Sequence, residues 1–210
     1  MDAARRRRST LLTQPGGTVG TTVGRSGGLG SSRYVGLLRG INVGGRNKVP
    51  MAELRSAFED AGYTAVSTYI QSGNILFGSS APRRSLEADV ERVLERRFGF
   101  PFVVVVRSHA QLRSVVANAP ATFGAEPDAY HSDAIFLRSP LTASQVMRIV
   151  KLREGVDRAW PGRGVVYFAR LSAERTKSRM SSIVGTPEYG NMTIRSWATT
   201  TKLLALLEDG

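Results

Sequence analysis

Residues 34–77 read YVGLLRGINVGGRNKVPMAELRSAFEDAGYTAVSTYIQSGNILF, and this stretch decides the fold of the N-terminal half of the chain. The apolar run from Tyr34 to Ile41 predicts a strand, and the glycine-rich segment 42–49 predicts a loop. Pro50 suits the first position of a helix, and apolar residues then recur at helical spacing until Gly62. The stretch therefore begins with a strand, a loop and a helix.

The rest of the N-terminal half completes a four-stranded unit. Residues 64–71 and 74–78 predict two strands, joined at Ser72-Gly73 by a tight turn in which glycine supplies the positive φ. A second helix is predicted between the N-cap Ser85 and the C-cap Gly99, and residues 102–107 predict the fourth strand. The element order βαββαβ is that of the ferredoxin-like plait, an antiparallel sheet with both helices on one face.

The C-terminal half repeats this order with negligible sequence identity. A linking helix and a loop occupy residues 109–130, and the chain ends with a helix through Leu207. Between them the pattern predicts strands at 134–138, 156–160, 165–171 and 192–195, and helices at 142–153 and 174–184. The predicted fold is α+β, with two ferredoxin-like plaits in tandem at residues 33–108 and 131–210, the second carrying the C-terminal helix.

Residues 1–32 differ in composition from the rest of the chain. They contain four consecutive arginines, Arg5 to Arg8, followed by a stretch rich in glycine, serine and threonine, with one acidic residue and no aromatic residue in the whole segment. Such a segment cannot bury enough apolar surface to offset its ordering entropy, so we expect a disordered tail. Three interpretations stay open: an organellar transit peptide, a basic arm for nucleic acid, and either an unstructured extension or a start codon placed too far upstream.

Composition limits the classes of protein to which the chain can belong. The 210 residues are 41% hydrophobic and contain no cysteine, which allows a sizeable core and excludes disulfides, thiolate metal sites and cysteine nucleophiles. No apolar run approaches the ~18 residues of a membrane span, so we expect a soluble, cytoplasmic protein without a membrane partner. The net charge of +12 falls to +7 without residues 1–33, which hold six arginines and one acidic residue. A surface of that charge attracts polyanions weakly and selects none of them.

Four motifs resemble a bacterial family of unknown function, DUF1697: LRGINVGG, NKVPMAELR, TYIQSGN and the C-terminal TIRSWATTTKL. The resemblance extends from Tyr34 to Leu207. It implies two plait-like α+β domains, and it brings no established substrate, cofactor or catalytic residue. The sequence departs from the family pattern at Ser196, where the family usually has asparagine. Both residues are good N-caps, so the helix start is preserved.

The glycine-rich loop after the first strand is the first predicted site. Because the loop leads into a helix, the amides of Gly44 and Gly45 and the free N–H groups of the helix start are expected to converge on an anion. The side chains assigned to this anion site are those of Arg39, Asn42, Arg46 and Lys48. The loop matches neither G-x-G-x-x-G nor a Walker A motif, and the alternative is a backbone turn with solvated cations.

The C-terminal motif is the second predicted site. Thr193, Arg195, Trp197 and Lys202 place a hydroxyl, two cations and an indole around one predicted helix start. This set suits a phosphate or, alternatively, the docking of this segment against the first domain. Docking is favoured by Trp197, since a tryptophan at an N-terminal helical position usually packs against protein.

Residue types for catalysis are sparse. His109 and His131 are the only imidazoles, and neither has a serine or aspartate partner at a recognisable spacing, so we expect both at the surface. The sequence has no HExxH or paired-carboxylate motif, so we predict no metal and no cofactor. No catalytic constellation is recognisable, and whether the protein is an enzyme stays open. An enzyme of phosphoryl or nucleotidyl chemistry that uses backbone amides, arginine and lysine stays open, because a plait can host one without histidine.

These observations lead to one expected function and two alternatives. We expect a small anionic or phosphorylated ligand to bind between the two domains, at the first loop and the C-terminal helix start. The alternatives are a nucleic-acid-binding module that uses the basic tail and surface, and a ligand-free interaction or assembly protein. An RNA platform of stacked aromatics is not expected, because both faces of the first strand are largely apolar. The second domain, or a second copy of the chain in a homodimer, is expected to cover the open face of the sheet.

Overall fold

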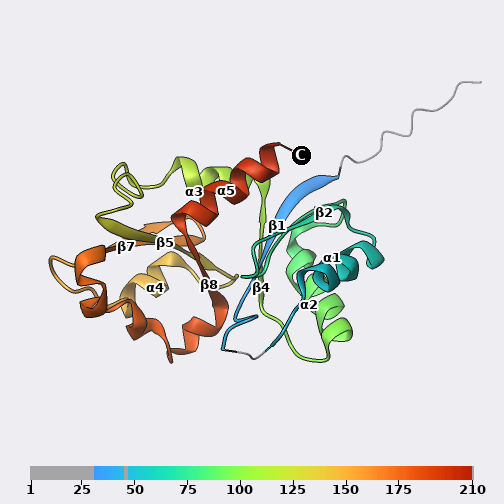
Figure 1. Cartoon of the computed structure of the whole chain (residues 1–210), viewed down its shortest axis with the longest axis horizontal. Helices are drawn as coiled ribbons and strands as arrows, with labels where there is room; N and C mark the ends of the chain where they lie inside the picture. Colours follow the sequence, from blue (N-terminus) through green and yellow to red (C-terminus); the bar gives the residue numbers. More distant parts are fainter. Residues whose placement is uncertain (1–30, 45–46, 210) are drawn as a thin grey trace, which may run out of the picture.

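The computed structural model describes residues 31–44 and 47–209 and contains two halves that lie side by side (Figure 1). The prediction of a disordered tail concerns mainly residues 1–30, which lie outside the described part of the chain. Gly45 and Arg46 of the first predicted site also lie outside it.

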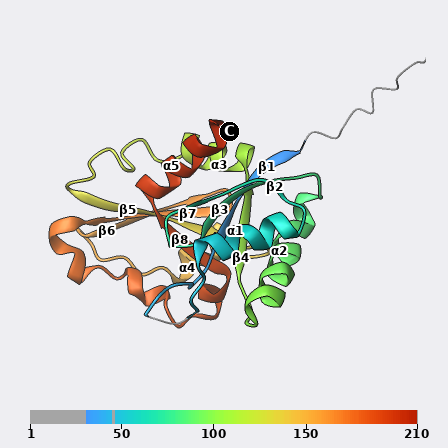
Figure 2. The same ribbon diagram turned by 45° about the vertical axis from the view of Figure 1, so that its right-hand side comes forward.

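The first half is a four-stranded antiparallel sheet whose two helices lie on one face (Figure 2). Its elements are β1 (Ser32–Leu38), α1 (Met51–Asp60), β2 (Thr64–Tyr69), β3 (Asn74–Ser79), α2 (Arg83–Phe98) and β4 (Val104–Ser108). The strand order β2-β3-β1-β4 confirms the predicted ferredoxin-like plait. Gly99 follows α2 with a φ of 77°, the left-handed conformation that a glycine C-cap adopts.

The second half repeats this arrangement after the linking helix α3 (His109–Ala117). Its elements are β5 (Tyr130–Leu137), α4 (Ala143–Ile149), β6 (Asp157–Gly162), β7 (Val165–Leu171), β8 (Met192–Ser196) and the terminal helix α5 (Trp197–Glu208). The strand order β6-β7-β5-β8 puts each strand in the position of its counterpart in the first half. The repeat of topology, predicted from element order alone, is confirmed.

One predicted helix is wrong. Residues 174–184 do not form an α-helix, and the segment between β7 and β8 consists of three short 3-10 helices: η1 (Ser172–Lys177), η2 (Met180–Ile183) and η3 (Pro187–Asn191). Side-chain oxygens here accept hydrogen bonds from backbone N–H groups that would donate to backbone carbonyls in an α-helix. Asp157 Oδ2 accepts from Arg179 N at 2.8 Å, and Ser178 Oγ accepts from Met180 N at 3.2 Å.

Three predicted boundaries also shift. Tyr69 pairs with Asn74, so β2 and β3 are joined by the four-residue loop 70–73, called here the hairpin loop, and not by a two-residue turn. α2 begins at Arg83, so Ser85 lies inside the helix and is not its N-cap. α4 ends at Ile149, before the predicted end at residue 153.

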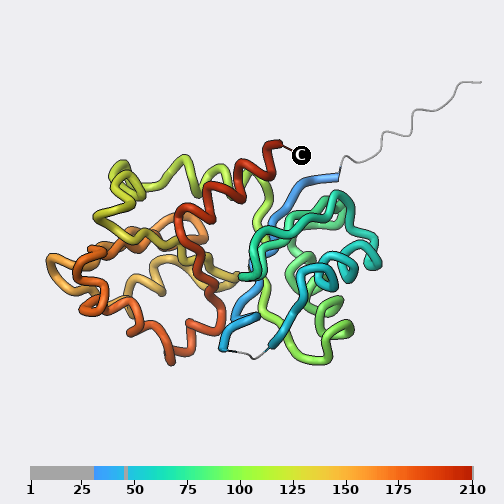
Figure 3. The backbone as a smooth tube through the Cα atoms, in the orientation of Figure 1, coloured from blue at the N-terminus to red at the C-terminus, as the bar shows by residue number. Residues whose placement is uncertain are grey.

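The inner faces of the two sheets share one core with α3 and α5, and α5 ends beside β1 (Figure 3). Val35 and Leu37 of β1 are fully buried in this core, on the face opposite α1 and α2. The helix side of the first sheet forms a separate cluster around Phe58 and Phe77. The open face of the first sheet is therefore covered by the second half, and it offers no aromatic platform to RNA.

Candidate functional site

Asn42 fixes the shape of the first loop. Its side-chain amide donates to the carbonyls of Val49 and Gln71, each at 3.0 Å, and its Oδ1 accepts from Val49 N at 2.8 Å. Asn42 and Gly44 have φ values of 55° and 60°, in the left-handed region that asparagine and glycine tolerate best. Asn42 thus fastens the first loop to the hairpin loop.

The cations of the first loop have different surroundings. The guanidinium of Arg39 lies over the ring of Tyr189, 4.6 Å from its centroid, in the second half. Lys48 is exposed to solvent. The described part of the predicted site therefore holds one cation engaged with an aromatic ring and one exposed cation.

Arg195 of the second predicted site is buried between the halves, with 7% of its surface exposed. Its Nε donates to Asn74 Oδ1 at 2.5 Å, and its Nη2 donates to the carbonyl of Leu38 at 2.8 Å. Nη2 also donates to the carbonyls of residues 72 and 73, and Nη1 donates to Thr193 Oγ1 at 2.8 Å. Burial lowers the pKa of Arg195 to about 10. These contacts fit the docking alternative.

Trp197 and Lys202 have different neighbours. The indole of Trp197 packs edge-to-face against Phe123 at 4.9 Å and Tyr167 at 6.2 Å, both in the second half. Lys202 is exposed on α5. The structure brings Arg195 to the hairpin loop beside the first loop, and Thr193 contacts Arg195. The aromatic contacts of Trp197 lie within the second half.

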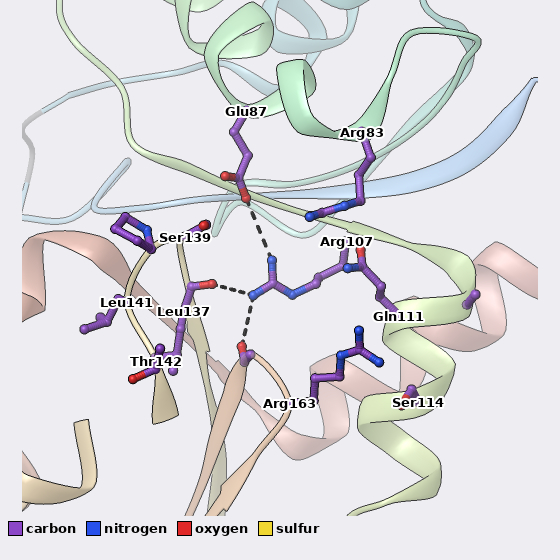
Figure 4. Close-up of a pocket in the computed structure, with 13 residues that line it drawn as sticks. Arg83, Glu87, Arg107, Gln111, Ser114, Leu137, Ser139, Leu141, Thr142 and Arg163 are labelled. Atoms are coloured by element: carbon purple, nitrogen blue, oxygen red, sulfur yellow. Dashed lines mark hydrogen bonds and ion pairs between the residues drawn. The ribbon is translucent and has the colours of Figure 1, made fainter. Parts of the chain in front are cut away.

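A pocket of about 470 Å³, called here the arginine pocket, lies where the two halves meet (Figure 4). The first half contributes Arg83 and Glu87 from α2 and Arg107 from β4, and α3 follows with Gln111. The second half contributes Arg163 from the turn between β6 and β7, and the segment 139–142 between β5 and α4. No sequence pattern had indicated this pocket.

Arg107 is fixed at the interface between the two halves, called here the joint. Its Nη2 donates to the carbonyls of Leu137 at 2.5 Å and Gly164 at 2.9 Å, and its Nη1 lies 3.8 Å from Glu87 Oε1. Burial lowers the pKa of Arg107 to about 10, the Glu87 carboxylate opposes this shift, and repulsion by Arg83 adds to it. Arg83 and Arg107 therefore act on one another electrostatically.

Arg83 and Arg163 reach the arginine pocket from opposite halves, and both are exposed (Figure 4). Neither forms an ion pair with any carboxylate of the described residues. Glu87 already accepts from Val106 N at 3.0 Å in addition to facing Arg107. The two exposed guanidinium groups are thus the donors that can meet a bound molecule.

Arg107 and Arg195 occupy equivalent positions in the two halves. Each is the fourth residue of the last strand of its plait, β4 or β8. Arg107 donates to the carbonyl of Leu137 at the end of β5, and Arg195 donates to the carbonyl of Leu38 at the end of β1. The joint therefore has a pseudo-twofold relation, as in an isologous dimer interface.

Each histidine lies beside one carboxylate. His109 Nε2 lies 3.6 Å from Glu208 Oε1, and His131 Nε2 lies 3.3 Å from Asp133 Oδ1. Asp133 is buried, and burial raises its pKa although His131 and Arg170 oppose the shift. Residues 31–44 and 47–209 contain no group of three or more side chains suited to hold a metal ion. Across the same residues every helix is too short or too polar to span a bilayer.

One solved structure is similar to this chain over most of its length. It is the conserved bacterial protein SP0830 from Streptococcus pneumoniae, with a TM-score of 0.75 and 29% sequence identity, covering 84% of this chain and 99% of that chain. No curated protein matches the chain. The family model described as "Protein of unknown function (DUF1697)" matches residues 32–167, so the chain belongs to the DUF1697 family.

Proposed function

We propose that the protein binds a small anionic or phosphorylated ligand in the arginine pocket. The observation that carries this proposal is the convergence of Arg83 and Arg163, one from each half, beside the buried Arg107. The described lining contains three arginines and one carboxylate, Glu87, which leaves a net charge of +2. An anion between the guanidinium groups relieves the repulsion between Arg83 and Arg107.

The size of the pocket favours an organic anion. Its volume of about 470 Å³ lies in the usual range of small-molecule sites, and it exceeds what an inorganic phosphate fills. Gln111, Ser114 and Thr142 also line the pocket and supply neutral polar groups for hydroxyls of the ligand. A sugar phosphate combines both kinds of group.

Isothermal titration calorimetry at low ionic strength tests the proposal, with ribose 5-phosphate, pyrophosphate and inorganic phosphate as probes. Arg83→Ala and Arg163→Ala are each expected to weaken the tightest probe about tenfold to a hundredfold, because a hydrogen bond to a charged group contributes ~1.5–3 kcal/mol. Arg84→Ala is the matched control, since Arg84 is the exposed neighbour of Arg83 and does not line the pocket. Its effect should stay below about twofold.

The same titrations separate the arginine pocket from the first loop, where anion binding remains a proposal of its own. Lys48→Ala removes an exposed cation of the first loop and should leave binding to the arginine pocket unchanged. A loss of affinity in Lys48→Ala, with no loss in Arg83→Ala or Arg163→Ala, would indicate that the anion binds at the first loop and not in the arginine pocket. Absence of binding by all three probes, or equal losses in Arg84→Ala and Arg83→Ala, would show that the proposal is wrong.

A further inference from the structure

A second cavity, of about 570 Å³, lies at the start of α5 and is called here the tryptophan cavity. Tyr130 and His131 of β5 line it on one side, and Trp197 and Ala198 of α5 line it on the other. It shares no lining residue with the arginine pocket. The inference drawn from it is therefore independent of the proposed function.

The indole wall of this cavity is held in one position. Phe123 packs edge-to-face against Trp197 with ring centroids 4.9 Å apart. Gly124 lies so close to the indole that a Cβ at this position would collide with it. An aromatic surface that is already fixed loses little entropy when a planar molecule packs against it.

Ser132 is the polar group of the cavity that the protein itself does not satisfy. The residue is 7% exposed and lines the cavity, and its Oγ has no hydrogen-bond partner within the described residues. Buried hydroxyls nearly always have a partner, so this one calls for an explanation. A bound molecule with an acceptor group supplies one.

The first turn of α5 adds donors at the same place. Ser196 Oγ accepts from Thr199 N at 3.2 Å, while the N–H groups of Trp197 and Ala198 precede the first donor of an intrahelical bond. These amides carry the partial positive charge of a 12-residue helix.

The charges next to the cavity are mixed. Glu126 and Arg158 line an adjoining pocket that shares Tyr130 and Ser132 with the tryptophan cavity, so the carboxylate there is accompanied by a guanidinium. His131 contributes an imidazole to the lining. The neighbouring carboxylate of Asp133 is paired with Arg170, whose Nη2 lies 3.1 Å from Asp133 Oδ2. The cavity thus combines an aromatic wall with donors for one acceptor group.

We propose that the tryptophan cavity binds a small aromatic carboxylate. The ring lies against Trp197 and Tyr130, and the carboxylate accepts from the Ser132 hydroxyl and from the first-turn amides of α5. A neutral aromatic molecule lacks the charge for the helix start, and an aliphatic acid lacks the ring, so both bind more weakly.

Tryptophan fluorescence tests this site directly. The chain contains two tryptophans, so Trp160→Phe leaves Trp197 as the only emitter. Phenylacetate is the probe, with phenylacetamide as the neutral analogue and acetate as the analogue without a ring. We expect a saturable change of the Trp197 fluorescence with phenylacetate. The affinity for each analogue should be at least about tenfold weaker.

Ser132→Ala, in the same Trp160→Phe background, separates a binding role from a structural one. It should weaken phenylacetate about tenfold while the melting temperature stays equal or rises, because alanine removes a buried hydroxyl without a partner. Ser182→Ala is the matched control: Ser182 Oγ also lacks a partner among the described residues but does not line the cavity. Its affinity for phenylacetate should match that of the background.

Three outcomes would overturn the proposal: no saturation with phenylacetate, equal affinities for phenylacetate and phenylacetamide, or an unchanged affinity in Ser132→Ala. If Trp160→Phe does not fold, saturation-transfer NMR on the otherwise unaltered chain and its Ser132→Ala variant gives the same comparisons.

Discussion

Arg195→Met tests whether a buried guanidinium holds the two halves together. Methionine has a flexible, unbranched apolar side chain that can follow the path of the arginine stem, and it has no hydrogen-bond donor. The five N–H groups of the guanidinium face six acceptors at 2.5–3.2 Å. Three of these N–H groups, on Nε and Nη2, donate to four acceptors in the first half, so one of them is shared between two carbonyls. The four acceptors are Asn74 Oδ1 and the carbonyls of Leu38, Ser72 and Gly73.

The expected loss of stability follows from two opposing quantities. At ~2 kcal/mol for a hydrogen bond from a charged donor, the three N–H groups that face the first half contribute roughly 6 kcal/mol. Burial of the charge offsets part of this, because the lowering of the pKa of Arg195 to about 10 corresponds to ~3 kcal/mol. The substitution should therefore lower the free energy of unfolding by about 3 kcal/mol, a large part of the ~5–15 kcal/mol typical of a protein.

Urea denaturation followed by circular dichroism and by tryptophan fluorescence measures this loss. Trp160 and Trp197 both lie in the second half, so fluorescence reports on that half and circular dichroism on both. Arg138→Met is the control, because Arg138 also bridges the joint, at 2.7 Å from Glu91 Oε2, but is partly exposed. Its loss should stay below ~1 kcal/mol. A loss in Arg195→Met below ~1 kcal/mol, or equal to that of Arg138→Met, would refute the reasoning.

Three further changes have defined outcomes. Ile70 is half-exposed and has a φ of 49°, a left-handed conformation that strains a β-branched residue and that asparagine tolerates better. Ile70→Asn should therefore raise the free energy of unfolding in urea by ~1 kcal/mol, and a decrease would contradict the presence of backbone strain. The buried hydroxyl of Tyr167 donates to a carbonyl of α3 at 2.6 Å, so Tyr167→Phe should lower that free energy by ~1–2 kcal/mol, and no change would contradict the bond. Burial raises the pKa of Asp133, so the folded state binds its proton more tightly than the unfolded state, and the resulting stability is lost as the pH rises through the folded pKa. The melting temperature of the wild type relative to Asp133→Asn should therefore fall as the pH rises from below 3.8, and a rise would contradict the assignment.

Apolar patterning predicted all eight strands. The pattern is clearest in the central strands such as β1, which buries both faces, and weakest in the edge strands β2 and β6, which have one buried residue each. The same patterning failed at residues 174–184, where the decisive contact comes from Asp157 on another strand. A side chain that distant in sequence leaves no trace in the local apolar spacing. Met180 and Ile183 of this segment are buried, but in a 3-10 helix and not in the predicted α-helix.

The arginine pocket could not be predicted in the same way, because Arg83 and Arg163 meet only through the docking of the halves. Among 29 lysines and arginines, nothing local distinguishes these two. A short sequence repeat does indicate the residues that dock the two halves. Arg107-Ser108 and Arg195-Ser196 each end the last strand of a plait and supply the N-cap of the following helix.

The pseudo-twofold relation connects the arginine pocket with the site predicted from sequence. The arginine pocket uses the connection after the first strand of the second plait, residues 138–142, together with Arg107 from the last strand of the first plait. The site predicted from sequence uses the equivalent connection of the first plait, residues 39–50, together with Arg195 from the last strand of the second. The site predicted from sequence is thus the counterpart of the arginine pocket on the other side of the joint. Its longer connection contains glycines and a lysine, which indicate an anion site, whereas Ser139 and Pro140 of the shorter connection give no such indication. The repeated topology gives the joint two equivalent places, and the Lys48→Ala and Arg163→Ala titrations decide which of them binds the anion.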